Sequence, residues 1–502
     1  MHKAGKKTMS NWKGFFRKLK ESLFGNDREE HVEIHPSVQE TITTSVPQVE
    51  VGRERRLERG PYFVQIGFDF GTAYSKCVCR DVITNKAWVY LPTRSECNEY
   101  PFLISSAILL RNGKLSHVEN PGCDYHADGL YHLKHALEKV ALCEWNDPVL
   151  DPYRNFPDMS HERQLAKFVQ NCAIYFLAGI LGDIRNHVRQ RFPGFALHKD
   201  DYMAVNLAVP VADAERPQVN RLYQRVLYEA WVLADQLHGH PAIDVSEVER
   251  SVIDVAKEEN PSHRNACFIY PEASANVQGF VRSRASSPGV YLFSDTGAGT
   301  VDQSVFIFLR GDHGEHLTYL HGSVIPLGSS LIERHAALAS GKMDWSGLEA
   351  WRQKKESGEN HPLLIEAKNR IHEELVCRTQ ETLARAKRKL IVKDQLNEIR
   401  VIFGGGGHCE HPYKTAVLRP FSGGLFRRGI SPDVLGMPVP RDLELEAGQT
   451  KWMRRLSVAY GLSFERSELS TFTYPIEVDT PKPEEIWRPR RRIQDAPGKE
   501  EC

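Results

Sequence analysis

The sequence predicts an α/β fold, because apolar strands and amphipathic helices alternate along its central part. Apolar, β-branched runs at 64–68, 290–293 and 400–403 each lead into a glycine turn. Strands that alternate with helices are typical of sheets covered by helices. The helical patterns that separate these strands lie at 162–190, 215–238 and 362–390.

The composition is that of a soluble globular protein with a sizeable core. The chain has 502 residues, 41% of them hydrophobic and 26% charged, which allows roughly two to four core-forming units. Basic and acidic residues both number 65, so net charge gives no reason to expect a nucleic-acid partner. No apolar run reaches the ~18 residues of a transmembrane helix, and the N-terminus lacks the pattern of a secretory signal.

The cysteines favour a cytoplasmic protein with reduced thiols. The ten cysteines are scattered and form no CxxC pair. Cys77 and Cys79 alternate in an expected strand at 77–80, so both would lie on one face as small apolar residues.

The two ends of the chain differ from its central part. Residues 1–60 contain a short basic amphipathic helix at 10–24, followed by a polar linker. This helix could anchor the protein to a membrane surface or a partner, or it could pack on the protein's own body. Residues 466–502 are rich in proline and charge, which predicts a disordered tail, with 487–492 as a possible basic docking peptide.

The first candidate site is a turn between two strands, at 68–76. Asp69 ends a strand, and Gly71 and Thr72 follow before the second strand begins. Glycine lets a backbone turn approach an anion and direct its N–H groups at phosphate oxygens. An aspartate at the strand end could hold a hydrated Mg²⁺. Taken alone, the pattern also fits an ordinary hairpin turn.

The second candidate site repeats this pattern at 294–302, again between two strands, the second at 303–309. Two such hairpins in one chain predict a two-sided clamp in which Asp69 and Asp295 approach a metal ion and an attacking water from opposite sides. The Thr300 hydroxyl and the turn amides would meet the β- and γ-phosphates of a nucleotide.

The third candidate site is the run of four glycines that begins at Gly404. Four glycines after an apolar strand have little structural purpose unless a ligand lies against bare backbone. A nucleoside is the simplest such ligand.

These three sites, in this order, resemble the superfamily of actin, sugar kinases and the heat-shock chaperones of the DnaK type. Segments between and after the three sites resemble the same superfamily. The likeness covers about residues 62–465, and the chaperone branch is favoured because sugar kinases lack the Ala-Lys-Arg helix. The supporting segments are the strand at 206–210, the first hinge at 268–275, the turn at 326–330, the Ala-Lys-Arg helix at 384–390 and the second hinge at 457–462.

The resemblance implies an actin-like ATPase fold of two lobes, 61–270 and 271–465, each built on a ribonuclease H-like mixed sheet. ATP and Mg²⁺ would lie in the cleft between them, and the γ-phosphate would be attacked in line by water. Hydrolysis would be slow, as in an ATP-gated switch that acts on a protein partner, and the hinges would carry the closure of the lobes.

The resemblance also assigns roles to individual residues. Asp69 and Asp295 would hold Mg²⁺, mostly through water, and Asp302 would support the second turn. Lys134 would orient the nucleophile, although an ordinary solvated helix lysine is the alternative. The remaining expected phosphate contacts are Gly71, Thr72, Ala73, Tyr74, Gly297, Ala298, Gly299, Thr300 and Gly328, and the expected adenosine contacts are Lys387, Arg388, Gly404, Gly405, Gly406 and His408.

The sequence also departs from the chaperone pattern. Ala298 replaces a glycine, which is tolerable if its φ is negative, and Tyr270 replaces a hinge glutamate. Only residues 388–404 separate Lys387 from the glycine run, so the adenine-side subdomain is expected to be reduced. Residues 466–502 are too few for a peptide-binding domain with its lid.

Three alternatives stay open at this point. The protein could be a small-molecule kinase or an actin-like filament-forming ATPase instead of a chaperone-like switch. The run 408–411 (His-Cys-Glu-His) could also bind a metal, although zinc ligands are usually spaced more widely.

Overall fold

The computed structural model describes residues 59–481, except for 93–98, 119–124, 157–158, 160, 210–215, 258–260, 284–285, 312–313, 410 and 427–428. All of them lie in one of the chain's two units, Leu57–Cys502. The expected helix at 10–24, the polar linker as far as residue 58 and the basic stretch at 487–492 lie outside the described residues.

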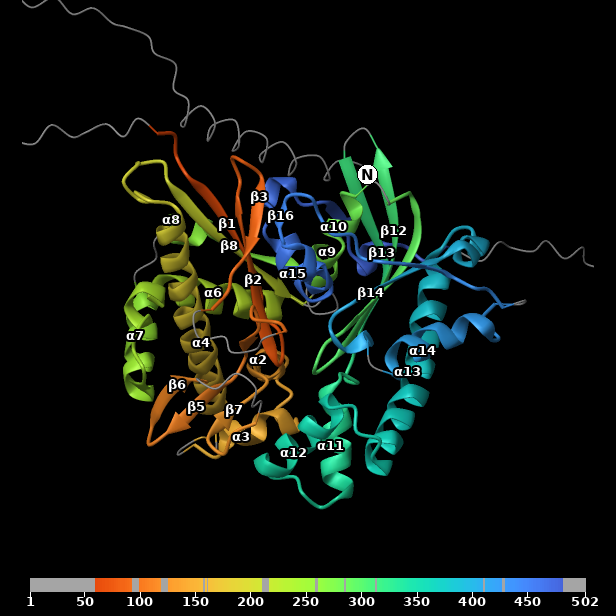
Figure 1. The fold of residues 1–502 in the computed structure, drawn as a ribbon, viewed down its shortest axis with the longest axis horizontal. Coiled ribbons are helices and arrows are strands. Elements are labelled where there is room, and N and C mark those ends of the chain that lie inside the picture. The colour runs from red at the N-terminus through yellow and green to blue at the C-terminus, as the bar shows by residue number, and fades with distance from the viewer. Residues whose placement is uncertain are drawn as a thin grey trace, which may run out of the picture. The chain divides into compact units, whose positions relative to one another are not determined.

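A seven-stranded mixed sheet, drawn mainly in red, orange and yellow in Figure 1, forms the first half of the described fold. Its central strand, β1 (Phe63–Asp69), pairs antiparallel with β2 (Tyr74–Asp81) and parallel with β8 (Tyr202–Val209). The sheet order is then completed by β10 (Cys267–Pro271) beyond β8, by β3 (Lys86–Val89) and β16 (Leu443–Glu444) beyond β2, and by β4 (Ile104–Ser105), which pairs with β2.

The second sheet repeats the strand order of the first. Its central strand, β11 (Gly289–Thr296), pairs antiparallel with β12 (Val301–Gly311) and parallel with β14 (Arg400–Gly404). In both sheets a further antiparallel strand follows the hairpin and a further parallel strand follows the central parallel pair. The two sheets are therefore duplicates in topology. The outer strands of the second sheet are β13 (Gly314–Ile325), β15 (Asp433–Leu435) and β17 (Thr471–Thr473).

The helices cover these sheets as the sequence predicts. Three helices observed at Glu162–Arg191 (α4), Pro217–Leu237 (α6) and Pro362–Lys389 (α13) confirm the expected patterns to within two residues. Proline at the first turn of α6 and α13 suits the start of a helix, where its missing N–H is not needed. The predicted α/β class with mixed sheets is confirmed.

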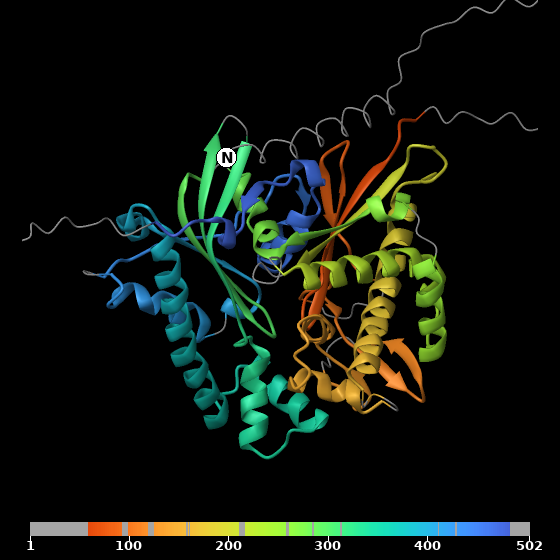
Figure 2. The same ribbon diagram turned by 180° about the vertical axis from the view of Figure 1, so that it is seen from behind.

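The first sheet packs against α4, α6 and α2 (Leu133–Ala141) through one apolar cluster, and the second against α13 through another. The two views in Figures 1 and 2 show α4 and α6 beside the first sheet and α13 along the second. The other helices are α3 (Asp151–Arg154), α7 (Val245–Lys257), α8 (Pro261–Asn265), α11 (Ser330–Ala339), α12 (Trp345–Glu356) and α14 (Tyr413–Leu418), and a small sheet contains β5 (Ile108–Arg111), β6 (Lys114–His117), β7 (Gly129–Leu130) and β9 (Ile243–Asp244).

The short helices between the two sheets each pack on the sheet that follows or precedes them from the other half of the fold. The chain leaves the first sheet through α9 (Glu272–Asn276) and α10 (Gln278–Val281), whose apolar side chains pack on the second sheet. It leaves the second sheet and continues to α15 (Met453–Leu462), which packs on the first. Each half of the fold therefore supplies a helix to the sheet of the other half.

This exchange changes two of the expected boundaries. Residues in the expected second lobe, 271–465, return to the first sheet through β16 and α15. The expected tail begins later than residue 466, because β17 adds a parallel strand to the second sheet.

By length and composition alone, α4 could span a membrane, but 83% of its most apolar window is buried inside the protein. Most of this helix is therefore part of the protein core. Cys77 and Cys79 are also fully buried, with Sγ atoms 3.8 Å apart. The prediction that both lie on one face of a strand is confirmed.

The contact between α9 and α15 leads to a first testable prediction. A Cβ atom added to Gly461 would lie 1.8 Å from the backbone oxygen of Ala275, so these two segments touch backbone to backbone. Gly461→Ala is expected to lower the free energy of unfolding by about 3 kcal/mol, because neither backbone can move away freely. Urea unfolding measures this. Gly448→Ala, where nothing lies within 4 Å, is the control, and equal stability of the two variants would contradict the packing.

Candidate functional site

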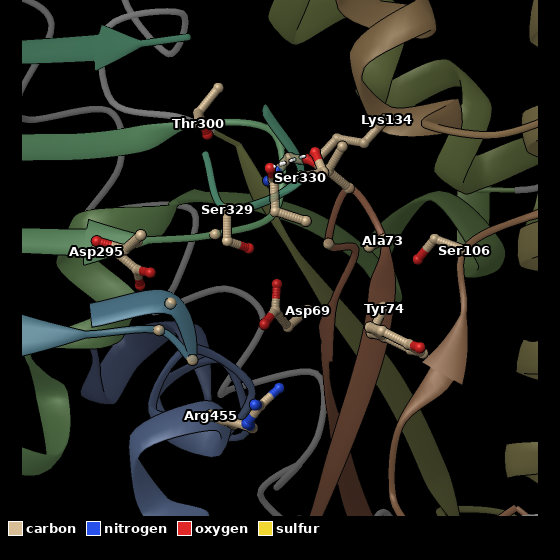
Figure 3. Close-up of a pocket in the computed structure, with 18 of the residues that line it drawn as sticks. Asp69, Ala73, Tyr74, Ser106, Lys134, Asp295, Thr300, Ser329, Ser330 and Arg455 are labelled. Atoms are coloured by element: carbon tan, nitrogen blue, oxygen red, sulfur yellow. Dashed lines mark hydrogen bonds between the residues drawn. The ribbon is translucent and has the colours of Figure 1, made fainter. Parts of the chain in front are cut away.

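A single cavity brings together most of the site residues expected from the sequence (Figure 3). It lies where the β1–β2 and β11–β12 hairpins turn, so residues from both sheets line it. The glycine run after β14 also reaches it. The expected residues that line the cavity are Asp69, Gly71, Thr72, Ala73, Tyr74, Lys134, Asp295, Gly297, Ala298, Thr300, Asp302, Gly405 and Gly406.

The first hairpin places a buried aspartate against a lysine. Asp69, only 2% exposed, is the last residue of β1, and Gly71 N donates to the Asp69 backbone oxygen at 3.1 Å. Lys76 is the register partner of Asp69 on β2. Its Nζ atom lies 2.6 Å from Asp69 Oδ2. The lysine therefore neutralises one carboxylate from within the same hairpin.

The second hairpin closes through its own hydrogen bonds. Gly297 N donates to Thr300 O at 2.9 Å, and Thr300 Oγ1 donates to Asp302 Oδ2 at 2.9 Å. Asp302 therefore supports this turn as the sequence suggested. Among the described residues Ala298 is not one of the non-glycine residues with positive φ, so the condition for replacing a glycine there is met.

A further turn packs on the second hairpin from behind. Gly328 N donates to Gly299 O at 3.2 Å, and Ser330 donates to Ala298 O through both its backbone N and its Oγ. Neither Gly299 nor Gly328 lines the cavity. A Cβ atom on Gly299 would lie 2.9 Å from Thr72 Cγ2, so the two hairpin turns touch each other.

Lys134 lies in the cavity, and it forms an ion pair with Glu272, which was not predicted as a site residue. Its side chain is 8% exposed, which excludes the alternative of a solvated helix lysine, and its Nζ lies 2.6 Å from Glu272 Oε2. Burial would lower the pKa of Lys134, but the carboxylates of Glu272 and Asp69 outweigh burial and raise the pKa. The ammonium group therefore stays charged.

Glu272 begins α9 directly after β10. Because β10, β8 and β1 run parallel, Glu272 comes to the same edge of the sheet as Asp69. This placement was a detectable signal, since a carboxylate at the end of a parallel strand points to the edge where the other site residues lie.

The site holds more negative charge than its lysines neutralise. Burial, and next the charge of Glu272, raise the pKa of Asp295 to about 7. The same two causes raise the pKa of Asp302 well above its usual range. Asp302 Oδ1 and Thr296 Oγ1 have no hydrogen-bond partner among the described residues. Crowded carboxylates and unpartnered oxygen atoms fit a site that takes a cation.

The residues present fit a hydrated Mg²⁺ better than a directly held metal. In the described part of the chain, no group of three or more His, Cys, Asp or Glu side chains could hold a metal ion. Mg²⁺ usually keeps several waters and uses one or two carboxylates. Asp69 and Asp295 could therefore hold it mainly through water.

The glycine run folds around Asp295. A Cβ atom on Gly405 would lie 2.2 Å from Asp295 Oδ1, and its φ of +76° is one that glycine adopts easily. Gly405, Gly406 and Gly407 line the cavity, while Gly404 does not. Bare backbone here lets the loop approach the carboxylate closely.

His408, an expected adenosine contact, does not line the cavity. Its ring stacks on Phe403 at 5.7 Å, and its Nδ1–H donates to Gly405 O at 2.7 Å. Burial lowers the pKa of His408, so the ring is neutral at pH 7. The possible metal site at 408–411 gains no support from the structure either. The His411 ring lies against His372, and residue 410 is outside the described residues.

Lys387 and Arg388 are also away from the cavity. Lys387 Nζ donates to Leu425 O at 3.1 Å, and Arg388 is exposed. The chain returns to β14 soon after α13 ends, which keeps the helix end beside the second sheet. The end of the helix therefore does not line this cavity, although the resemblance implied adenosine contacts there.

Several other residues that line the cavity were not expected from the sequence. Lys355 of α12 pairs with Glu333 of α11 at 2.8 Å, and Lys76 pairs with Asp69. Arg455 projects from α15 toward the cavity (Figure 3). The only hint in the sequence was two consecutive arginines next to the expected second hinge.

Comparison with known protein families finds no matching family model, and comparison with curated proteins finds no match.

Proposed function

We propose that this protein binds ATP with Mg²⁺ in the cavity and hydrolyses it slowly, within a two-lobed actin-like fold. The observation that carries the proposal is the duplication: two sheets of equal strand order meet at one cavity, and each contributes a hairpin with an aspartate just before its turn. Duplicated hairpins of this kind suit a ligand with negative charge along its length, since each turn offers backbone N–H groups to it.

The cavity residues divide into phosphate contacts and groups near the reacting water. The turns at 71–74 and 297–300 would hold phosphate oxygens, and Asp69 and Asp295 would orient the waters of a bound Mg²⁺. When bound, that ion neutralises phosphate charge. Lys134 would draw the γ-phosphate close, and Glu272, held by Lys134, would accept a proton from the attacking water.

The helices between the sheets support a switching role. Glu272 begins α9, and α9 touches α15 through the Gly461 contact. Closure of the cavity around ATP would pass through these segments and change the surface that meets a protein partner. A chaperone-like action on an as yet unidentified protein is part of this proposal.

Nucleotide binding is testable by thermal unfolding of the full chain. ATP with Mg²⁺ at about 100 times its Kd is expected to stabilise the protein by ~2.7 kcal/mol, and EDTA is expected to remove most of this gain. Asp69→Asn should lose the gain as well, because it removes one of the Mg²⁺-orienting carboxylates. An unfolding temperature that ATP and Mg²⁺ leave unchanged would refute the proposed function.

A further inference from the structure

Arg455 lines the cavity and forms no ion pair among the described residues, although its charge helps to lower the pKa of the exposed Glu99. Lys76, Lys134 and Lys355 line the same cavity, and each of them is paired with an aspartate or glutamate. Among the described residues, no hydrogen bond or ion pair joins the Arg455 side chain to another group. Arginine does not lose its proton in proteins, so the N–H groups of the half-exposed Arg455 stay available as donors to a ligand.

The guanidinium group of Arg455 is held in a defined plane. Its Cζ lies 4.4 Å from the centroid of the Tyr100 ring. On the other segment that touches it, a Cβ atom on Gly406 would lie 2.7 Å from Cζ and within 3.0 Å of both terminal nitrogens. A side chain at Gly406 would push the guanidinium aside, so the group lies between an aromatic ring and bare backbone.

The Tyr100 ring is itself fixed by its neighbours. The rings of Tyr100 and Phe102 meet edge to face at 6.0 Å, and Phe102 packs on Trp452 at 5.0 Å. Trp452 Nε1 donates to Glu99 O at 3.0 Å. This aromatic chain joins the start of α15 to the loop before β4, so the guanidinium plane is set before any ligand arrives.

The position of Arg455 determines which part of a bound nucleotide it can contact. In Figure 3 Arg455 lies below Asp69 and Lys134 lies above it. Under the proposed function, Lys134 and Glu272 mark the γ-phosphate, so a nucleotide that extends past Asp69 brings its nucleoside toward Arg455.

From this geometry we propose that Arg455 is the nucleoside-binding residue of the cavity and donates hydrogen bonds to acceptor atoms of the base or ribose. It takes the place of Lys387, Arg388 and His408, which do not line the cavity. Because a ring and a backbone segment contact the guanidinium, its N–H edge is what it offers to the ligand. The inference rests on the proposed function and adds the residue that distinguishes a nucleotide from a bare phosphate chain.

The test compares ATP with inorganic tripolyphosphate, both with Mg²⁺, by calorimetric titration of the full chain. Arg455→Ala is expected to weaken ATP binding about 10- to 100-fold while tripolyphosphate binding changes less than about 2-fold. Arg455→Lys should stay nearly as weak, because an ammonium group lacks the planar fork. Equal losses for both ligands, or no loss for either, would overturn the proposal.

Three further variants separate this role from an effect on folding. Lys451→Ala removes another cation that lies over the Tyr100 ring, at 5.7 Å, and should leave ATP binding unchanged. Tyr100→Phe should also bind normally, whereas Tyr100→Ala should weaken ATP and spare tripolyphosphate. Loss with Lys451→Ala equal to that with Arg455→Ala would count against the proposal. If the unaltered protein binds neither ligand, the proposed function itself fails.

Discussion

Asp295→Asn is expected to lower the affinity for ATP with Mg²⁺ by about 100-fold and to make the ligand-free protein more stable at pH 8. The loss follows because an amide cannot replace the negative charge that orients the Mg²⁺ waters. The gain follows because the carboxylate of Asp295 is buried among other carboxylates, which raises its pKa from 3.8 to about 7. Ionising it in the folded state costs at most about 4 kcal/mol.

The pH dependence of this stability gain has a definite direction. The folded state holds the Asp295 proton more tightly than the unfolded state, so the contribution of Asp295 to stability falls as pH rises from about 4 to about 7 and is then constant. Asparagine does not titrate. The stability advantage of the variant should therefore be largest above pH 7 and shrink toward pH 4.

Urea unfolding at pH 5 and pH 8, with calorimetry for nucleotide affinity, measures both effects. Asp244→Asn is a matched control, because Asp244 is exposed and pairs weakly with Lys114 at 3.8 Å. A variant that binds ATP as tightly as the unaltered protein, or one that is less stable at pH 8, would contradict the role given to Asp295.

Glu272→Gln is expected to lower the rate of phosphate release by about 100- to 10,000-fold while nucleotide affinity changes little. Glutamine keeps the size and can still accept a hydrogen bond from Lys134, so the cavity should keep its shape. It cannot take a proton from the attacking water. Single-turnover phosphate release and calorimetric affinity separate the two quantities.

Glu356→Gln provides the comparison for this variant. Glu356 also lines the cavity, but its side chain is half exposed and pairs with Arg352 at 2.6 Å. Its replacement should leave the hydrolysis rate unchanged. Equal rates for the Glu272 and Glu356 variants would show that Glu272 is not the base.

Local patterns in the sequence predicted the elements well. The helices at α4, α6 and α13 and the strands β1, β2, β11, β12 and β14 are where apolar periodicity and glycine turns placed them. Hairpin chemistry also predicted that Asp69 and Asp295 lie where two strands run into glycine turns. These features depend on residues close together in the chain, so the sequence carries them directly.

Contacts between segments far apart in the chain were not predicted from the sequence. Glu272 and Lys134 are 138 residues apart, and their pairing depends on how β10 and α2 meet the same edge of one sheet. Lys387 and Arg388, the expected adenosine contacts, do not line the cavity for the same reason. Their spacing resembled a known helix, but the short return to β14 keeps that helix end against the second sheet.

By itself the sequence determined the α/β class, most of the central elements and the two aspartate-ending turns, because periodicity and turn chemistry are local. Only the tertiary structure decided that α15 crosses to the first sheet and that His408 stacks inside the protein. It also decided that Arg455 and Glu272 enter the cavity. Burial and charge pairing depend on which surfaces meet in space, and no run of neighbouring residues encodes that.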